Sequence, residues 1–163
     1  MNTATAHSID EVINLLAGSV AQVFDTMLNT DAQPAPLQDI RQSDAPMVAG
    51  SVGFIGEANG VVYVYYKATF ARTLASRMLR MAEAELDANE MVDDVIGELT
   101  NMIVGSIKSR LCDAGTPCVL TIPSVVRGQN LRGGPTCACE FRLLTIQCGE
   151  EMILLELLMK PPK

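Results

Sequence analysis

The amino-acid sequence predicts an α+β domain in which an antiparallel sheet packs against long helices. The segments 10–28 and 93–111 both repeat apolar residues at steps of three and four, which is the spacing of one helix face. The segments 61–67 and 151–160 are short and rich in β-branched and other apolar residues, as strands are. With the intervening segments they predict the order α-β-β-α-α-β-β-β and antiparallel pairing.

Length and composition indicate one globular domain over residues 1–163. With 48% hydrophobic residues, the chain can bury about 70% of the surface that its unfolded form exposes. It has 12 Lys and Arg against 19 Asp and Glu, a net charge of −7 and no basic run, so nucleic acid and anionic membrane are not expected as partners. The apolar runs 61–66 and 152–159 are too short to span a membrane, and no signal-peptide pattern is present, so we expect a cytoplasmic protein.

The first half of the chain is expected to form a capped helix, a loop and a hairpin. Ser8 or Asp10 can cap a helix that runs to about Leu28. Its apolar side consists of Ile9, Val12, Ile13, Leu16, Val20, Val23, Phe24 and Met27. The segment Thr30–Pro46 contains three prolines and is expected to be turn and loop. Two strands joined by a turn follow, at Met47–Ile55 and Val61–Lys67.

The second half is expected to hold two more helices followed only by strands. Thr69 can cap a helix at about Phe70–Met81, whose inward side would include Leu74, Met78 and Leu79. The central helix is expected to begin near Asn89. Strands are predicted after it, at Val119–Ile122, in a segment after Pro123, and at Thr136–Gln147 and Glu151–Lys160.

The central helix carries the polar pattern that points to a function. Its apolar side consists of Val92, Val95, Ile96, Leu99, Met102, Ile103, Ser106 and Ile107. The opposite edge, here named the polar ridge, consists of Asp94, Glu98, Asn101, Gly105 and Lys108. Gly97 and Gly105 each weaken a helix by roughly 1 kcal/mol relative to alanine. An exposed glycine beside a carboxylate and a carboxamide therefore suggests that a second macromolecule approaches the ridge closely.

Several common site chemistries have no support in the sequence. The five cysteines contain no C-x-x-C pair and are expected to be reduced thiols in the core, without a disulfide framework or a zinc site. His7 is the one histidine, which removes most metal and triad chemistry. Nucleotide-binding glycine motifs are missing, and Arg127–Pro135 is interpreted as a polar connection. We therefore expect no cofactor bound by this chain.

The first helix is similar in sequence to the central helix. Residues 10–28 and 93–111 align without a gap and share five identities in nineteen positions. The similarity leaves an internal pseudo-repeat open, because two amphipathic helices share a pattern by necessity. In this register Leu15 matches Glu98 and Gly18 matches Asn101, so the first helix cannot do what the Glu98 and Asn101 pair does.

Three short motifs lie in and after the central helix. They are D-x-x-x-E-x-x-N at Asp94, Glu98 and Asn101, N-M-I-x-G-x-x-K at Asn101–Lys108, and I-P-S-V at Ile122–Val125. In this combination the chain resembles the CheC/CheX/FliY phosphatases of bacterial chemotaxis over most of its length. The length, the element order and the single E-x-x-N helix are most similar to the CheX type.

This resemblance implies an activity and a catalytic pair. Family members dephosphorylate CheY-type response regulators, so the implied activity is that of an aspartyl-phosphate protein phosphatase. Glu98 and Asn101 would be the catalytic residues that enter the active site of the regulator. Pro123 would be structural. A neutral carboxamide such as that of Asn101 can order a water molecule beside an anionic phosphoryl group without the repulsion an aspartate would suffer.

The resemblance also implies partners. The substrate would be a phosphorylated CheY-type response regulator that brings its own Mg²⁺, and the partner contacts would be Asp94, Gly97, Gly105 and Lys108. CheX forms a homodimer, so a homodimer is implied here too. Ile146 and the apolar strand at Met152–Met159 are expected to lie at a sheet edge that could pair between subunits.

Other interpretations of the same residues stay open. A non-catalytic receiver-binding adaptor or motor-associated module would use the same helix face, and a phosphatase assay separates it from an enzyme. A sensor domain that binds a small ligand between helix and sheet is a third interpretation. A glutamate and an asparagine three residues apart can also be solvated surface without a function.

Overall fold

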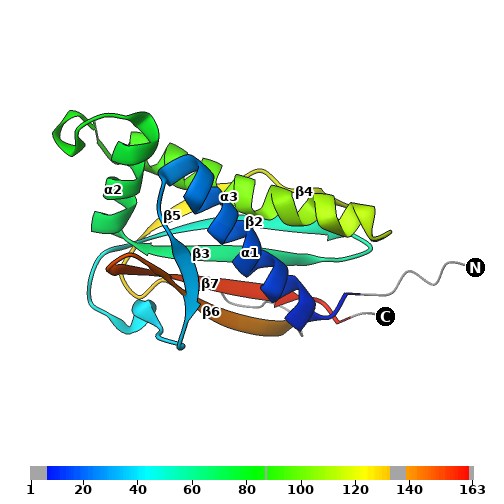
Figure 1. Cartoon of the computed structure of the whole chain (residues 1–163). Coiled ribbons are helices and arrows are strands. Elements are labelled where there is room, and N and C mark those ends of the chain that lie inside the picture. The colour runs from blue at the N-terminus through cyan, green and yellow to red at the C-terminus, as the bar shows by residue number, and fades with distance from the viewer. Residues whose placement is uncertain (1–6, 87, 133–138, 162–163) are drawn as a thin grey trace, which may run out of the picture.

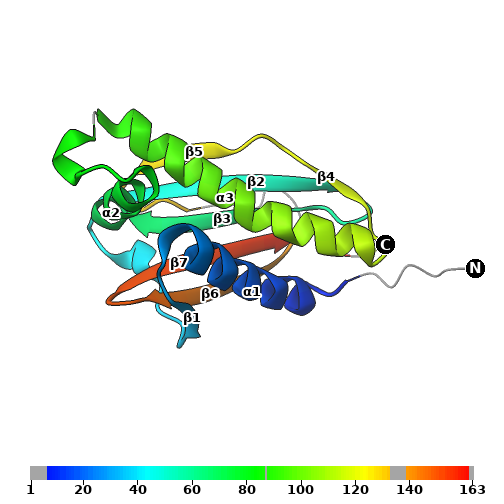
Figure 2. The same ribbon diagram turned by 45° about the horizontal axis from the view of Figure 1, so that its top comes forward.

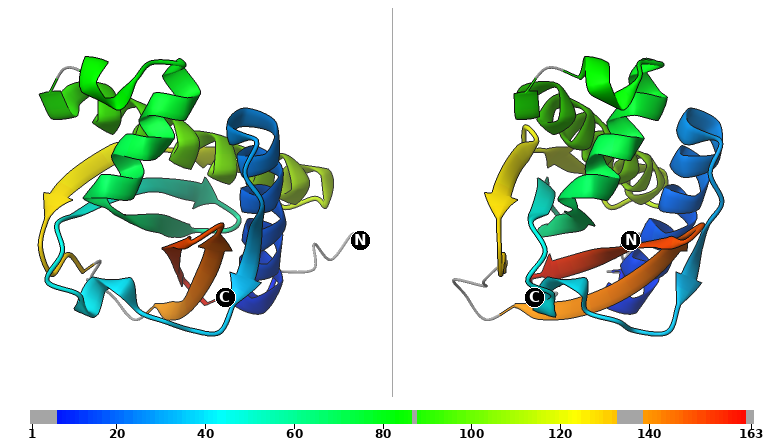
Figure 3. Two further views of the ribbon diagram at one scale, coloured as in Figure 1. Left: turned by 60° about the vertical axis from the view of Figure 1, so that its left-hand side comes forward. Right: turned by 90° about the vertical axis from the view of Figure 1, so that its left-hand side faces the viewer.

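The computed structural model of the protein describes residues 7–86, 88–132 and 139–161. Within these residues, seven strands form one curved sheet. Three helices lie on one face of the sheet (Figures 1 and 3). The helices are α1 (Ile9–Leu28), α2 (Ala68–Leu79) and α3 (Ala88–Asp113). The strands are β1 (Ala32–Ala35), β2 (Met47–Gly56), β3 (Gly60–Lys67), β4 (Cys118–Leu120), β5 (Ser124–Gly128), β6 (Glu140–Cys148) and β7 (Glu151–Met159). The predicted α+β class is confirmed. The predicted order contains two strands fewer, but among the predicted segments only β1 is missing.

The strand order supports an internal pseudo-repeat. It runs β1-β6-β7-β3-β2, and β4 and β5 both pair with the far side of β2. All of these pairs are antiparallel. The hairpins β2–β3 and β6–β7 meet at the central β3–β7 pair. Because β1 pairs with the second hairpin and β5 with the first, the units α1-β1-β2-β3 and α3-β5-β6-β7 exchange strands and form one sheet.

Helix α1 follows the prediction closely. Ser8 and Glu11 form a capping box, in which the Ser8 hydroxyl accepts from the Glu11 backbone and the Glu11 carboxylate accepts from the Ser8 backbone. Asn29 ends the helix in the left-handed conformation. The predicted apolar side is buried except for Met27, which is exposed. Met27 was therefore assigned wrongly, because the neighbouring Leu28 is the residue of the last turn that packs into the core.

Helices α1 and α3 lie side by side on the sheet (Figure 2). The buried Ser19 hydroxyl of α1 donates a hydrogen bond of 2.7 Å to the Ile103 carbonyl of α3. Apolar side chains from both helices join β2, β3 and β7 in one core. This packing leaves the side of α3 that faces away from the sheet open to solvent.

Helix α3 packs closely against β2 at Gly50. The Thr100 hydroxyl, which donates 2.7 Å to the Ile96 carbonyl, occupies the space that a side chain at position 50 would need. The methyl Cγ2 of Ile96 would be 3.2 Å from a Cβ there. A glycine at position 50 therefore allows α3 to rest directly on the backbone of β2.

The segment Thr30–Pro46 contains regular structure that the sequence did not indicate. Strand β1 pairs with β6, and a short 3-10 helix, η1 (Ile40–Gln42), follows it. Pro34 is compatible with β1 because the strand lies at the edge of the sheet, where one side needs no backbone donor. The prediction of turn and loop is wrong there because β6, the partner of β1, is more than a hundred residues away in sequence.

Helix α2 and strand β6 differ from the prediction in some details. Helix α2 begins at Ala68, directly after β3, and its N-cap is Lys67 without a side-chain hydrogen bond, so Thr69 is not the cap. Leu79 at its end is exposed rather than inward. After α3, β4 and β5 lie at the segments predicted near Val119–Ile122 and after Pro123, and both pair with β2. The predicted strand Thr136–Gln147 begins at Glu140 among the described residues; positions 136–138 lie outside them.

The face of the sheet opposite the helices is held by a buried ion-pair network. The Arg41 guanidinium donates to Asp39 at 2.9 Å through two nitrogens and to Glu156 of β7 at 2.9 Å. The Tyr65 hydroxyl of β3 also donates to Glu156, at 3.1 Å. The hydrogen bond from Arg41 lowers the pKa of Asp39. The stability that the Asp39 carboxylate contributes is therefore present above the pKa of an unfolded aspartate. It is lost as the pH falls through the lowered pKa of Asp39 in the folded protein.

Substitution of Gly50 by alanine should destabilise the fold. A methyl group there would collide with the Thr100 hydroxyl, so α3 must shift, and we expect a loss of about 1–3 kcal/mol in the free energy of unfolding. Urea denaturation followed by circular dichroism measures this. Gly18→Ala is the matched control, because Gly18 is exposed and has no atom within 4 Å of its Cβ position. It should gain up to about 1 kcal/mol. An unchanged Gly50→Ala protein would contradict this packing of α3.

Candidate active site

The polar ridge lies on the side of α3 that faces away from the sheet. Asp94 and Glu98 are exposed, whereas Asn101, Gly105 and Lys108 are half-buried. On the apolar side, Met102 and Ser106 are half-buried and the other predicted residues are buried. Thr100, Val104 and Leu111 are also buried, which extends the stripe beyond the prediction. The helical spacing therefore predicted the orientation of α3, and it missed the depth at which Asn101 lies.

Glu98 and Asn101 have no partners among the described residues. Neither side chain makes a hydrogen bond or an ion pair there. By contrast, Asp93, just beside the ridge, pairs with Arg127 of β5 at 2.6 Å. A carboxylate and a carboxamide one turn apart on a rigid helix, both without a partner, are free to bind groups of another molecule.

Gly97 is not part of the exposed surface. It is buried, and a Cβ at this position would lie 3.6 Å from Pro123 Cβ and 3.6 Å from Val125 Cγ2. The assignment of Gly97 to partner binding is therefore wrong. Gly97 lies against the segment around Pro123, and a methyl group at position 97 would make only ordinary contacts with that segment. Sequence spacing could not reveal this contact, because β5 arrives from a later part of the chain.

Gly105 has the open surroundings that the sequence suggested. Nothing lies within 4 Å of its Cβ position, and the residue is half-exposed on the ridge. Lys108, at the far end of the ridge, is near enough to Cys118 of β4 for its charge to affect the pKa of that thiol. The ridge thus runs from an acidic end at Asp94 to a basic end at Lys108, with an open backbone patch between them.

Comparison with known proteins identifies the family of this chain. The family model described as "Chemotaxis phosphatase CheX" matches residues 48–141. The chain belongs to the CheX family. The "CheY-P phosphatase CheX" of Thermotoga maritima is 26% identical over 123 residues, which cover 74% of this chain and 78% of that protein.

Solved structures share the fold of the CheX family with this chain. The chemotaxis protein CheX from Vibrio vulnificus has a TM-score of 0.79 and 22% identity, and the match covers 95% of this chain and all of that one. A CheX–CheY–BeF3–Mg²⁺ complex from Borrelia burgdorferi has a TM-score of 0.71 and 18% identity, over 92% of this chain and 98% of that chain. The second comparison shows that a protein with this fold has been captured with CheY.

The cysteines of this CheX-family chain differ in burial. Cys112, four residues after Lys108 near the end of α3, is exposed, so the prediction of core thiols is wrong for it. Cys118 and Cys148 are buried and unsuited to nucleophilic catalysis. Burial raises the pKa of the Cys148 thiol to about 12 and also raises that of Cys118. His7 contacts Glu11 at 3.4 Å in the first turn of α1. The part of the chain that the structure describes contains no group of three His, Cys, Asp or Glu residues that could hold a metal ion. Cys137 lies outside the described residues.

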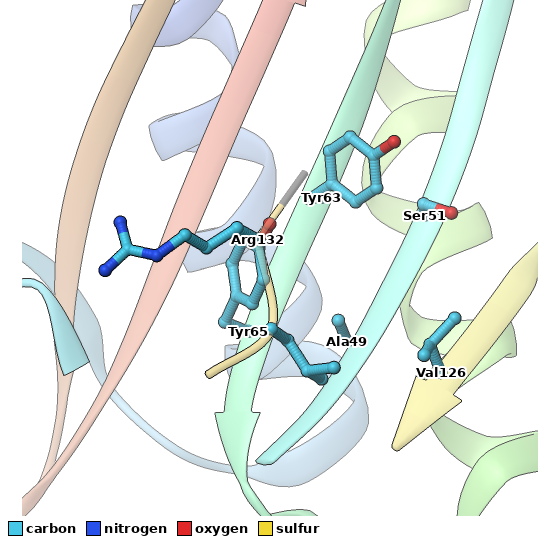
Figure 4. Close-up of a pocket in the computed structure, with 7 residues that line it drawn as sticks. Ala49, Ser51, Tyr63, Tyr65, Val126 and Arg132 are labelled. Carbon is cyan, nitrogen blue, oxygen red and sulfur yellow. The ribbon is translucent and has the colours of Figure 1, made fainter. Parts of the chain in front are cut away.

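A hollow on the helix-free face does not support a small-ligand site of the expected kind. Its volume is about 90 Å³, and Ala49, Ser51, Tyr63 and Tyr65 form its floor (Figure 4). Ligand pockets usually measure about 300–1,000 Å³. The guanidinium of Arg132 points away from Ser51 and leaves a mostly apolar lining (Figure 4). The hollow also faces away from the helices, so it is not a cavity between helix and sheet.

Helix α1 offers no second polar pair. Leu15 is half-buried against the core and Gly18 is exposed, as the sequence alignment of the two helices predicted. Of the two matching helices, α3 alone therefore presents Glu and Asn at these positions.

Within the described residues, none of the helices combines the length and the apolar character that a membrane span requires.

Alanine at Glu98 or Asn101 should leave the fold intact. Neither side chain has a partner to lose, so the free energy of unfolding should change by less than about 0.5 kcal/mol. Leu99→Ala is the matched control on the same turn, because Leu99 is fully buried and should cost about 2–5 kcal/mol. Urea denaturation of the three variants tests this. A loss at Asn101 as large as that at Leu99 would show that Asn101 is a packing residue.

Proposed function

We propose that this chain is a phosphatase that accelerates hydrolysis of the aspartyl-phosphate of a CheY-type response regulator. The observation that carries the proposal is the unpartnered Glu98 and Asn101 pair on an outward-facing helix in a CheX-family fold. The Thermotoga maritima relative is a CheY-P phosphatase, which supports the activity. In this proposal, residues 1–163 act as a single phosphatase domain.

Asn101 is the proposed catalytic residue that positions water. Phosphoryl transfer requires in-line positioning and charge stabilisation, and the attacking water is the component that a receiver domain alone holds least firmly. A carboxamide can accept a hydrogen bond from this water and donate one to a phosphoryl oxygen. Asn101 is half-buried on a well-packed helix, so little side-chain freedom would be lost when it engages the water.

Glu98 is the proposed docking carboxylate of the pair. It is exposed and unpaired, one turn before Asn101, and it can form a charge-assisted hydrogen bond with a lysine of the receiver. Such a bond would fix the depth at which α3 enters the active site of the receiver. Asp94 and Lys108 would contact the rim, and the open backbone at Gly105 would allow close approach.

Magnesium belongs to the substrate in this mechanism. The complex from Borrelia burgdorferi contains Mg²⁺ together with CheY and BeF3, which supports a receiver that supplies the metal. The metal would neutralise charge on the phosphoryl oxygens. The residues of this chain would order the water and hold the two proteins in register.

The main alternative is an adaptor that binds a receiver through the same ridge without catalysis. Complex formation alone cannot separate the two functions. Dephosphorylation rates can, because an enzyme acts in many cycles and an adaptor leaves the intrinsic decay of the phosphorylated receiver unchanged.

Asn101→Ala should retain receiver binding and lose about 10²-fold in turnover number. The expected loss follows from removing one preorganised polar group that acts in the transition state. Stopped-flow phosphate release, measured over a range of phosphorylated receiver concentrations, gives kcat and KM. Gly18→Ala, at the matching position of α1, should keep the wild-type rate. Wild-type kcat in Asn101→Ala would remove the proposed role of Asn101.

Glu98→Ala should differ from Asn101→Ala in kind. Loss of a proposed salt bridge should raise KM as well as lower kcat, and the difference from wild type should shrink as salt screens the pair. The measurement repeats the phosphate-release assay at low and at high ionic strength. An Asn101-like defect without any change in KM or salt dependence would contradict the docking role.

A homodimer is also part of the proposal, with support from the family resemblance and from exposed apolar side chains on the helix-free face at Ile55, Val119 and Val126. The prediction that Ile146 and Met152–Met159 lie at a sheet edge and pair between subunits is wrong. Strand β7 lies between β6 and β3, and β6, which carries Ile146, lies between β1 and β7. Neither strand is a free edge. Light scattering should give twice the chain mass of 17.5 kDa, and a monomer at micromolar concentration would contradict the proposal.

A further inference from the structure

Ile122 is a large apolar side chain that the fold holds out in solvent. It is 88% exposed, more than any other large hydrophobic residue in the described part of the chain. It lies between β4 and β5, in the segment Thr121–Pro123. Single exposed apolar residues are common on protein surfaces. The position and the rigidity of Ile122 distinguish it from such residues.

The backbone on both sides of Ile122 is fixed. The Thr121 backbone donates to the Gly53 carbonyl at 2.9 Å, and the Gly53 backbone donates to the Thr121 hydroxyl at 2.8 Å. On the other side, Pro123 packs beside Gly97 of α3. Ile122 therefore lies on a segment that is attached to β2 and to α3. Little conformational entropy would be lost when a partner covers it.

Ile122 is also continuous with the polar ridge. Pro123 lies at Gly97, and Gly97 precedes Asn101 by one helical turn. The segment between β4 and β5 runs alongside α3 on this side (Figure 2). A receiver whose phosphorylation site sits over Asn101 would extend past Pro123, and its rim would reach Ile122. On the other flank of α3 lies helix α1, whose Gly18 position carries no side chain.

We propose that Ile122 is an apolar anchor that binds the phosphorylated receiver beside its active site and selects receivers with an apolar rim there. This inference rests on the proposed function and adds a second kind of contact to it. The polar ridge supplies the chemistry, whereas Ile122 supplies binding that is equal in the ground state and the transition state. Such a contact lowers KM and leaves kcat unchanged.

The test is Ile122→Ser in the full chain, with two measurements. Phosphate release should show KM raised about tenfold or more with kcat unchanged, which is the effect of removing one buried aliphatic side chain from an interface. Fluorescence anisotropy with a beryllofluoride-treated receiver should show the same loss of affinity without any turnover. Leu37→Ser, which removes another exposed leucine-sized side chain from the loop between β1 and η1, should change neither value.

The outcomes are distinguishable from failure of the proposed function. If wild type accelerates no receiver but binds the beryllofluoride-treated form, the phosphatase proposal fails and anisotropy still tests Ile122. Wild-type affinity and KM in Ile122→Ser would overturn the inference. If Ile122→Ser has half the particle mass of wild type in light scattering, the inference is also overturned, because Ile122 would then lie between two copies of the chain. If Ile122→Ser does not fold, the β-branched Ile122→Thr replaces it in both measurements.

Discussion

The contact between α3 and β2 at Gly50 determines which side of α3 is exposed. Because position 50 has no side chain, the Thr100 hydroxyl and Ile96 rest on the strand backbone, and this contact fixes the rotation of the helix. With that rotation, Leu99 and Ile103 are buried, and Glu98 and Asn101 turn away from the sheet. Rotation by one residue, about 100°, would bury the polar pair without partners, at a high free-energy cost.

The exchanged strands of the two pseudo-repeat units make this arrangement rigid. Neither unit can complete its share of the sheet alone, since β1 pairs with β6 and β5 pairs with β2. The two helices are therefore held side by side, and the Ser19 to Ile103 hydrogen bond links them directly. Of the two helices held in this way, α1 has its apolar side in the core, and α3 also presents the Glu98 and Asn101 pair.

The sequence predicted those parts of the fold that depend on local pattern. The helical periodicity located α1 and α3, and the D-x-x-x-E-x-x-N spacing indicated which face of α3 is polar. It could not predict β1, because Pro34 reads as a breaker and the pairing partner of the strand is remote. Gly97 was misassigned for a similar reason. Spacing shows that a residue is near the ridge, but only the tertiary fold shows that Pro123 covers it.

The sequence also gave no signal for the Arg41, Asp39 and Glu156 network. These residues are scattered along the chain, and Glu156 interrupts an otherwise apolar strand. Only the fold brings η1 over β7, where Asp39 and Glu156 both accept hydrogen bonds from one buried guanidinium. The network stabilises the helix-free face and lies on the side of the sheet opposite the ridge.

The central claim is that α3 catalyses dephosphorylation rather than only binding a receiver. The most direct measurement follows the decay of a phosphorylated receiver from the same genome in the presence of one-tenth its concentration of wild-type chain. The account predicts accelerated loss of the whole phosphorylated pool, which requires repeated turnover by each molecule of the chain. Decay at the intrinsic rate for every receiver, with binding of the beryllofluoride-treated form retained, would contradict it and identify an adaptor.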